Sequence, residues 1–386
     1  MNECRSAESS GSEATEVAVL LWAAAVGTSF FTLAPTLVGA LIDQLRLSVH
    51  EVGLIASGEL AGSAVGSVLV LLYGRLFSAR AALTTSLVLV GICNLATAAA
   101  HDFTTIALWR VAAGLGAGLA FSVVNAATAR SRKAGLMFAA ISIVQMVFGA
   151  AGFIGAPSVI GACGLAGVFR ILGGCALGCA VASLLFIPGV PVHGSRLRSS
   201  MSVTPRGALL LLSLFATYLT SAAVWTYLER IGVEARLASH VISLGLSIGM
   251  LAGVLGSVGA TLLLWRGRDP DYSLIAGAAL MALSTSLLVK AAAPAAYLTA
   301  LFGFNGALAF VTPLYLTRVA AESAGDGRIL VAMLAMDLGL IGGPVLGAGL
   351  VGLGYEDLIR IAAALFVAAT LLALGSSRLS PEVVTS

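Results

Sequence analysis

The chain has 386 residues, of which 59% are hydrophobic and only 10% are charged, and its formal net charge is +3. A soluble domain carries roughly 25% charged residues, so this composition excludes a soluble globular protein and indicates one with several membrane spans. The basic residues stand in short clusters between apolar runs, which gives no reason to expect nucleic-acid binding.

Apolar runs long enough to cross a bilayer follow one another along the whole chain. A membrane-spanning helix needs about 20 mostly apolar residues, and twelve such runs are found. The first six are expected at residues 17–41, 52–73, 81–100, 104–128, 134–157 and 166–189. The second six are expected at residues 207–228, 241–265, 273–290, 295–317, 329–352 and 358–376. The predicted fold class is an all-α integral membrane protein with twelve transmembrane helices.

A polar and basic segment near the middle, "VPVHGSRLRSSMSVTPR", separates the two sets of spans. The predicted organisation is an N-terminal tail, a six-helix bundle, a linker, a second six-helix bundle and a C-terminal tail. Their ranges are 1–16, 17–189, 190–206, 207–376 and 377–386.

Lys and Arg are distributed unevenly between the two sides of the predicted membrane. With the N-terminus in the cytoplasm, the cytoplasmic segments contain 14 of these residues and the outer segments contain 5. Because positive residues accumulate in cytoplasmic loops, both termini are expected to be cytoplasmic. So compact a chain is expected in a bacterial inner membrane.

The two halves share short sequences in the same order. The stretch "LAGSAVGSV" at 60–68 resembles "LAGVLGSV" at 251–258, and each is followed by an apolar run and a Gly-Arg pair. The stretch "GLAF" at 118–121 resembles "GALAF" at 306–310. Parallel repeats of this kind form transporters whose substrate site lies between the repeats.

Several of these segments resemble the major facilitator superfamily of secondary transporters, over residues 17–376. The stretch "LWRVAAGLGAG" at 108–118 resembles the family's helix 4 motif, and "GFIGAPSVIG" at 152–161 is similar to the helix 5 motif of its antiporters. Gly74 and Arg75, in "YGRLFSAR" at 73–80, stand where the family has a basic loop, without the Asp that relatives carry there. The resemblance implies two six-helix bundles working by alternating access, as in drug and metabolite exporters.

Two charged residues lie inside predicted spans at one depth. Glu59 follows Glu51 by eight residues, and Arg110 follows Asp102 by eight residues, so each lies about 12 Å from the outer edge of its helix. We expect the two side chains to be able to meet. They could form a permanent pair that locks the helices. Alternatively, Glu59 binds a proton in one state, or Arg110 receives an anionic substrate group, since burial and a nearby Arg act oppositely on a carboxyl group.

Asp337, in "LAMDLGLIGGP", is a second acidic residue inside a span. An ionisable residue within the membrane suggests a functional site, so Asp337 is a second candidate for proton coupling. Its alternative role is to cap a helix break before Gly343 and Pro344.

Small residues and prolines mark where helices can approach closely or bend. Gly114 and Gly118 are four residues apart on the face that carries Arg110, a spacing that permits close helix packing. Bends are expected at Gly152 and Pro157 and again at Gly343 and Pro344.

The resemblance also implies that helices 1, 4, 7 and 10 line the substrate cavity, and the amide of Gln145 on helix 5 is added to these. Together the candidates are aromatic and weakly polar, which favours an amphipathic or aromatic substrate. They are Phe30, Phe31, Thr32, Arg110, Asn125, Gln145, Tyr218, Thr220, Ser221, Trp225, Phe302, Asn305, Phe310 and Thr312.

The function expected from the sequence is proton-coupled export of a small molecule by antiport. The alternatives are a symporter or facilitator that imports a metabolite and, more distantly, a membrane-embedded enzyme. No GxxxxGK[ST] phosphate-binding loop is present in the sequence, so ATP is not expected to drive transport directly. We expect no cofactor, no metal and no catalytic residue, with the small molecule, protons and lipid as partners of a monomer.

Overall fold

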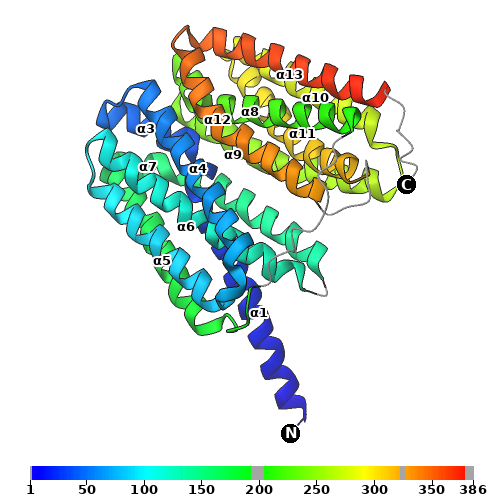
Figure 1. Ribbon diagram of the computed structural model, residues 1–386. Helices are drawn as coiled ribbons and strands as arrows, with labels where there is room; N and C mark the ends of the chain where they lie inside the picture. The colour runs from blue at the N-terminus through cyan, green and yellow to red at the C-terminus, as the bar shows by residue number, and fades with distance from the viewer. Residues whose placement is uncertain (1, 132, 193–203, 322–326, 379–386) are drawn as a thin grey trace. The chain divides into compact units, whose positions relative to one another are not determined.

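The computed structural model describes residues 2–131, 133–192, 204–321 and 327–378, and its regular elements in these ranges are helices (Figure 1). Ten described helices are long and apolar enough to cross a membrane. The predicted all-α membrane fold is therefore confirmed. Most of the predicted linker at 190–206 and of the C-terminal tail at 377–386 lies outside the described residues.

The first predicted span is interrupted twice. Helix α1 (Asn2–Gly27), the single turn α2 (Ser29–Thr32) and α3 (Ala34–Leu45) are separated by Thr28 and Leu33. Pro35, in the first turn of α3, lacks the N–H that would donate to the preceding turn. The first predicted span therefore consists of three helical segments, and α2 is the middle one.

The next three spans are formed by α4 (Val49–Tyr73), α5 (Ala79–Ala99) and α6 (Phe103–Ala129), with the short 3-10 helix η1 (Gly74–Leu76) after α4. Asp102 caps α6, since its carboxylate accepts a hydrogen bond from the backbone N–H of Thr105 at 2.9 Å. This bond lowers the pKa of the exposed Asp102 carboxyl group.

One long helix, α7 (Ala134–Phe186), contains the fifth and sixth predicted spans. Gly164 divides it, with a left-handed backbone at φ 67° that glycine adopts without steric cost. The side-chain oxygen of Gln44 accepts the backbone N–H of Leu165 at 2.8 Å, which satisfies a donor freed by this bend. The break predicted between 157 and 166 is confirmed.

The second set of spans is formed by six helices. They are α8 (Pro205–Glu234), α9 (Ser239–Trp265), α10 (Pro270–Leu287), α11 (Pro294–Ala321), α12 (Gly327–Val351) and α13 (Tyr355–Arg378), with the 3-10 helix η2 (Leu288–Lys290) after α10. Pro205 and Pro270 each occupy the first turn of their helix, where proline is favoured.

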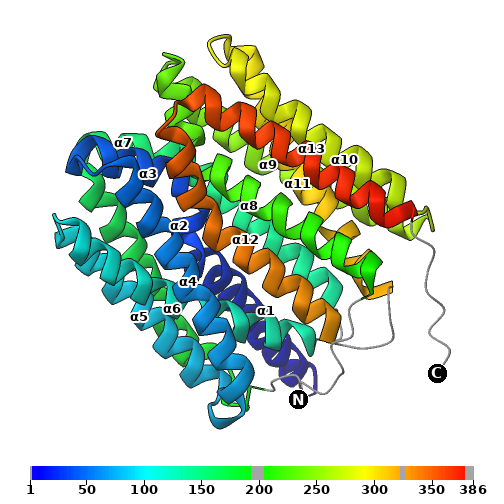
Figure 2. The same cartoon turned by 45° about the horizontal axis from the view of Figure 1, so that its top comes forward.

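The chain divides into two compact units. Unit 1 contains Met1–Leu47, Gly58–Gly149 and Ser158–Ser195, and unit 2 contains Ser48–Ser57, Ala150–Pro157 and Arg196–Ser386. Within unit 1, α5 packs against α6. Within unit 2, α9 lies beside α11, and α8 lies beside α12 and α13, as both views show (Figures 1 and 2).

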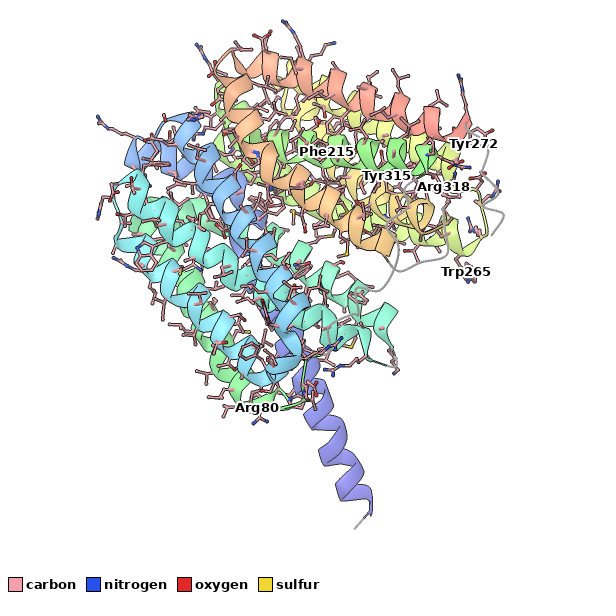
Figure 3. All side chains as sticks on the ribbon, viewed as in Figure 1. Arg80, Phe215, Trp265, Tyr272, Tyr315 and Arg318 are labelled. Atoms are coloured by element: carbon pink, nitrogen blue, oxygen red, sulfur yellow. The ribbon has the colours of Figure 1, made fainter. Side chains whose placement is uncertain are left out.

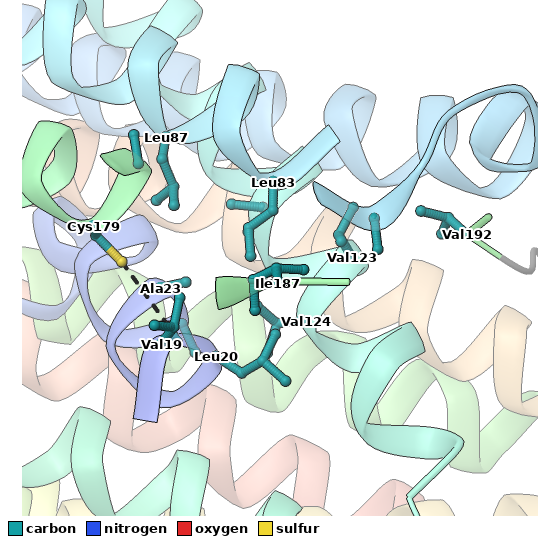
Figure 4. Packing of buried hydrophobic residues seen from close by; sticks show 14 of the residues in the cluster. Val19, Leu20, Ala23, Leu83, Leu87, Val123, Val124, Cys179, Ile187 and Val192 are labelled. Atoms are coloured by element: carbon teal, nitrogen blue, oxygen red, sulfur yellow. Dashed lines mark hydrogen bonds between the residues drawn. The ribbon is translucent and has the colours of Figure 1, made fainter. Parts of the chain in front are cut away.

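An apolar cluster fills the interior of unit 1 between α1, α5, α6 and the end of α7. Leu20, Leu83 and Val124 are among its buried members (Figure 4). The Cys179 thiol lies 3.9 Å from the carbonyl oxygen of Val19, so this cysteine acts as a small packing residue. Between membrane-spanning helices such side chains stabilise the fold through close packing, because lipid tails are as apolar as the side chains themselves.

Exposed aromatic residues mark one end of unit 2. Trp265 ends α9 and Tyr272 lies in the first turn of α10, and both side chains are exposed (Figure 3). Arg266 follows Trp265 directly, and Arg268 stands two residues further on. Aromatic and basic residues together are typical of a membrane–water interface.

Candidate proton and substrate site

Helices α4 and α6 touch through their backbones. A Cβ added to Gly114 would collide with the carbonyl of Glu59, and one added to Gly118 would collide with the carbonyl of Ser63. From the other side, Gly62 and Gly66 of α4 leave no room for a side chain against α6. The close packing predicted for Gly114 and Gly118 is present. Gly62 and Gly66, at the same four-residue spacing, were missed.

This contact brings Glu59 and Arg110 together inside unit 1. The Nη1 atom of Arg110 lies 3.4 Å from Oε2 of Glu59. Glu59 is 7% exposed and Arg110 is 0% exposed, so both charges are buried. The prediction that they can meet is therefore confirmed. A charge-assisted hydrogen bond is typically about 2.7–2.9 Å long, so this single contact is longer than usual.

Two phenyl rings hold the arginine independently of the glutamate. The guanidinium carbon of Arg110 lies over the rings of Phe30 and Phe169, at 5.0 Å and 5.2 Å from their centroids. The rings are 6.4 Å apart and 13° from parallel. Cation–π contacts contribute about 2 kcal/mol or more where water is excluded. Arg110 therefore remains stabilised when Glu59 loses its charge.

One edge of the Arg110 guanidinium has no hydrogen-bond acceptor among the described residues. Its Nε and Nη2 atoms are both buried and both lack a partner. In a guanidinium, these two N–H groups lie along one edge and match the two oxygens of a carboxylate. Arg230 uses the same edge in this chain, with Nε and Nη2 at 2.6 Å and 3.1 Å from the two oxygens of Glu229. The guanidinium edge with which Arg230 binds a carboxylate is thus without an acceptor in Arg110, within the described residues.

The interrupted first span lies beside this site. Phe30 belongs to the single turn α2, and the Gln145 amide donates hydrogen bonds to Thr28 Oγ1 at 2.9 Å and to the Ala24 carbonyl at 3.3 Å. Gln145 therefore holds the distorted turn at Thr28, just before Phe30, and its role as a site residue stays a prediction.

The corresponding helices of unit 2 pack in the same way, with no charged residue at the two matching positions. Gly256 of α9 leaves no room for a side chain against the Gly306 carbonyl of α11. Met250 stands in α9 where Glu59 stands in α4, because "LAG" at 60–62 repeats at 251–253, and the same offset from Arg110 reaches Leu301. Unit 2 therefore repeats the glycine contact but not the ion pair.

Asp337 lies on α12, half-buried, and makes no hydrogen bond or ion pair within the described part of the chain. Nearby on α8, the Tyr218 hydroxyl bonds to Thr312 Oγ1 of α11 at 2.7 Å. The structure does not bring Asp337 together with Glu59 in one unit.

The other predicted cavity residues are scattered over both units. Phe302 is 46% exposed, whereas Trp225 is buried against Phe153 in an edge-to-face contact at 5.9 Å. Asn305 donates to the Leu301 carbonyl of its own helix at 3.1 Å. The remaining ones are partly or fully buried, namely Phe31, Thr32, Asn125, Thr220, Ser221, Phe310 and Thr312.

The residues at which bends are predicted lie in two helices and have different contacts. Pro157 lies inside α7 and Pro344 inside α12. Gly343 packs directly on α8, where a Cβ would collide with Ala222, and the Pro344 carbonyl accepts the Tyr227 hydroxyl at 3.2 Å. Gly152 lies in α7. Gly74 packs against Val192, and Arg75 is exposed.

A cluster of two arginines and one acid in unit 2 was missed in the sequence. Asp271, in the first turn of α10, forms ion pairs with Arg318 of α11 and with Arg206 of α8. In unit 1, Arg80 and Arg130 instead donate to the carbonyls of Ile187 and Pro191, at 2.6 Å and 3.2 Å. The loop at 73–80 lacks an Asp that could pair with these arginines, and main-chain carbonyl oxygens accept their hydrogen bonds instead. The signal for Asp271 was its place just after the repeated Gly-Arg pair.

A cavity of about 250 Å³ in unit 1 is lined by neither Glu59 nor Arg110. Its lining includes Glu16, Leu20, Val123 and Arg130. It contains none of the residues predicted to bind substrate or protons.

Comparison with known proteins now places the chain in a class. The family model of the Major Facilitator Superfamily matches residues 19–330, so the chain belongs to this family. It is an integral membrane protein, and family and fold indicate a transporter rather than an enzyme. No curated protein matches the chain.

Solved structures share the fold at low identity. A variant of the nucleoside transporter NupG has a TM-score of 0.78 and 12% identity, covering 94% of this chain and 98% of that one. A bacterial homologue of the human lysosomal transporter Spinster, inward-facing and occupied, has a TM-score of 0.71 and 14% identity, covering 94% and 96%. At this identity the likeness shows the fold alone.

Proposed function

We propose that the chain is a proton-coupled secondary transporter for a small amphipathic or aromatic molecule, with Glu59 as the group that binds and releases the proton. The observation that carries this proposal is the long single contact between Glu59 and Arg110, at 3.4 Å between two buried side chains. Because Phe30 and Phe169 hold Arg110 separately, Glu59 can change its charge without releasing the arginine.

The alternative role for the pair is a permanent lock between α4 and α6. Three features argue against it. The contact is long and involves one nitrogen, the glycines already pack the two helices backbone to backbone, and α9 and α11 pack similarly with no charge at the matching positions. Buried ion pairs also contribute little net stability, because desolvation offsets their attraction.

The charge of the substrate decides the transport mode at such a pair. With Glu59 ionised the pair is neutral, and with Glu59 protonated it carries one positive charge. A cationic substrate binds better to the first form and is exchanged for protons, whereas an anionic one binds better to the second and moves with the proton.

We propose export in exchange for protons as the first mode, supported by the likeness of residues 152–161 to the antiporter motif. Import together with protons is the second mode, and the free Nε and Nη2 atoms of Arg110 support it. Asp337 is the second candidate for the proton-binding group. A bacterial inner membrane and a monomeric state complete the proposal.

The proposal is tested by proton flux in liposomes that contain the purified protein and a trapped pH dye. Amphipathic cations, aromatic acids, amino acids, sugars and nucleosides are added in turn, the last because a nucleoside transporter shares the fold. We expect substrate-triggered proton movement that is lost in Glu59→Gln and kept in Asp337→Asn, and its direction separates the two modes. Unchanged flux in a folded Glu59→Gln protein would contradict the proposal and move the proton role to Asp337.

A further inference from the structure

We propose that the free edge of Arg110 is a carboxylate site, and that it takes a small planar aromatic acid. This inference rests on the proposed proton role of Glu59, and it names the substrate class of the same site. The two donors of the edge, Nε and Nη2, are buried on a side chain with 0% exposure and lack any acceptor in the described part of the chain.

Leaving two buried donors without acceptors is costly, at about 1–3 kcal/mol for each group. Natural proteins pair almost all such groups, so an unpaired edge on a fully buried arginine points to an acceptor that comes and goes. The Arg230–Glu229 pair shows the geometry that this edge forms with a carboxylate in the same chain.

The surroundings favour a single negative charge over a phosphate. Glu59 and the Cys93 thiol of α5 interact electrostatically with Arg110, and Arg110 is the one cation found to act on either of these two described groups. One guanidinium neutralises one carboxylate, whereas a doubly charged phosphate would leave one buried charge uncompensated.

The surroundings also favour an aromatic acid. Phe30 and Phe169 form an apolar surface under the guanidinium, with their rings 13° from parallel. A carboxylate bound along the edge brings its attached group close to these two rings, and an aromatic group suits such an apolar surface. Access requires movement nearby, and Phe30 lies on the one-turn helix between the interruptions at Thr28 and Leu33.

Binding of the acid is linked to protonation of Glu59. The ligand carboxylate and the Glu59 carboxylate compete for one arginine, so the acid binds best when Glu59 is neutral. The groups that face Glu59 are Arg110 on α6 and Cys93 on α5. Acid and proton therefore bind together, which supports the second of the two transport modes.

The test uses benzoate and its neutral isostere benzamide, with the full-length purified protein in nanodiscs and calorimetric Kd values. At mildly acidic pH we expect benzoate to bind at least about tenfold more tightly than benzamide, because charge-assisted bonds to the edge are lost in the amide. The Kd for benzoate rises by up to about tenfold per pH unit towards alkaline pH in the wild type. In Glu59→Gln the Kd stays low and constant.

Arg110→Lys keeps the charge but removes the two-donor edge, and we expect it to weaken benzoate binding about tenfold or more. Arg170→Lys, at an exposed arginine of α7, is the matched control and leaves binding unchanged. If Arg110→Lys does not fold, the comparison of benzoate with benzamide on the wild type decides.

The outcomes separate the inference from the function it rests on. Equal affinity for benzoate and benzamide overturns the carboxylate site, even where Glu59-dependent proton flux shows that the proposed function holds. Benzoate binding that needs Arg110 but does not vary with pH in the wild type supports the carboxylate site and overturns the proton role of Glu59.

Discussion

The α4–α6 pair of unit 1 and the α9–α11 pair of unit 2 pack through the same kind of contact but differ in charge. Both use glycines that bring two backbones together, at Gly118 in one and Gly256 in the other. Only the first contains an ion pair, at positions where the second has Met250 and Leu301. The comparison teaches that the charges are not needed for the packing, and therefore that Glu59 and Arg110 are available for transport.

The largest expected effect comes from breaking the contact that the two pairs share. Gly118→Leu would place a side chain against the backbone of Ser63, which the helices cannot avoid without separating. Overpacking costs about 1–3 kcal/mol and occasionally more, and here backbone opposes backbone, so we expect little folded protein by size-exclusion chromatography. Gly178→Leu, at a glycine of α7 with open space around it, is the control and should remain folded.

A smaller effect tests whether unit 1 tolerates the residues of unit 2. Glu59→Met leaves Arg110 as a buried cation without its counter-ion. This should lower the free energy of unfolding by about 3–5 kcal/mol, reduced by the cation–π stabilisation that Phe30 and Phe169 still give to Arg110. Adding Arg110→Leu should restore the midpoint of thermal unfolding, because an apolar replacement of a buried ion pair is often neutral or stabilising. A double variant no more stable than Glu59→Met would show that the pair is structural.

A third change weakens only the aromatic support of the arginine. Phe169→Leu removes one of the two rings under Arg110 and should cost about 1–3 kcal/mol in unfolding free energy. The loss should shrink in the Arg110→Leu background, where no cation remains, and a double-mutant cycle by chemical denaturation measures this. Equal losses in both backgrounds would mean that the ring contributes through apolar packing alone.

The smallest effect concerns the cap of α6, outside the membrane span. The hydrogen bond from Thr105 holds the pKa of Asp102 below its ordinary value, so its contribution to stability is present at neutral pH and is lost as pH falls through that lowered pKa. Asp102→Asn keeps a good cap but cannot titrate. As the pH is lowered into the acid range, we expect the midpoint of thermal unfolding to fall less steeply for the variant than for the wild type. Parallel plots of this midpoint against pH would show that titration of the Asp102 cap does not contribute to stability.

Much of this fold could be predicted from the sequence, because span length and apolar composition are local properties. The break between residues 157 and 166 was predicted from span length, and the common depth of Glu59 and Arg110 from counting along two helices. The interruptions at Thr28 and Leu33 were not predicted, because single-residue deviations leave the apolar pattern unchanged.

The part of the site that could not be predicted depends on contacts across the fold. Phe169 lies on α7 and reaches Arg110 on α6, and no spacing in the sequence relates the two. The free edge of Arg110 is likewise a property of what surrounds it. Gly62 and Gly66 could have been identified, since their spacing matches that of Gly114 and Gly118.

The most direct test of the central claim is the protonation of Glu59 itself. Infrared difference spectra of the wild type between mildly acidic and mildly alkaline pH should show a protonated carboxyl band that appears as the pH falls. The account predicts that this band is lost in Glu59→Gln and kept in Asp337→Asn. A band that persists in Glu59→Gln and disappears in Asp337→Asn would contradict the account.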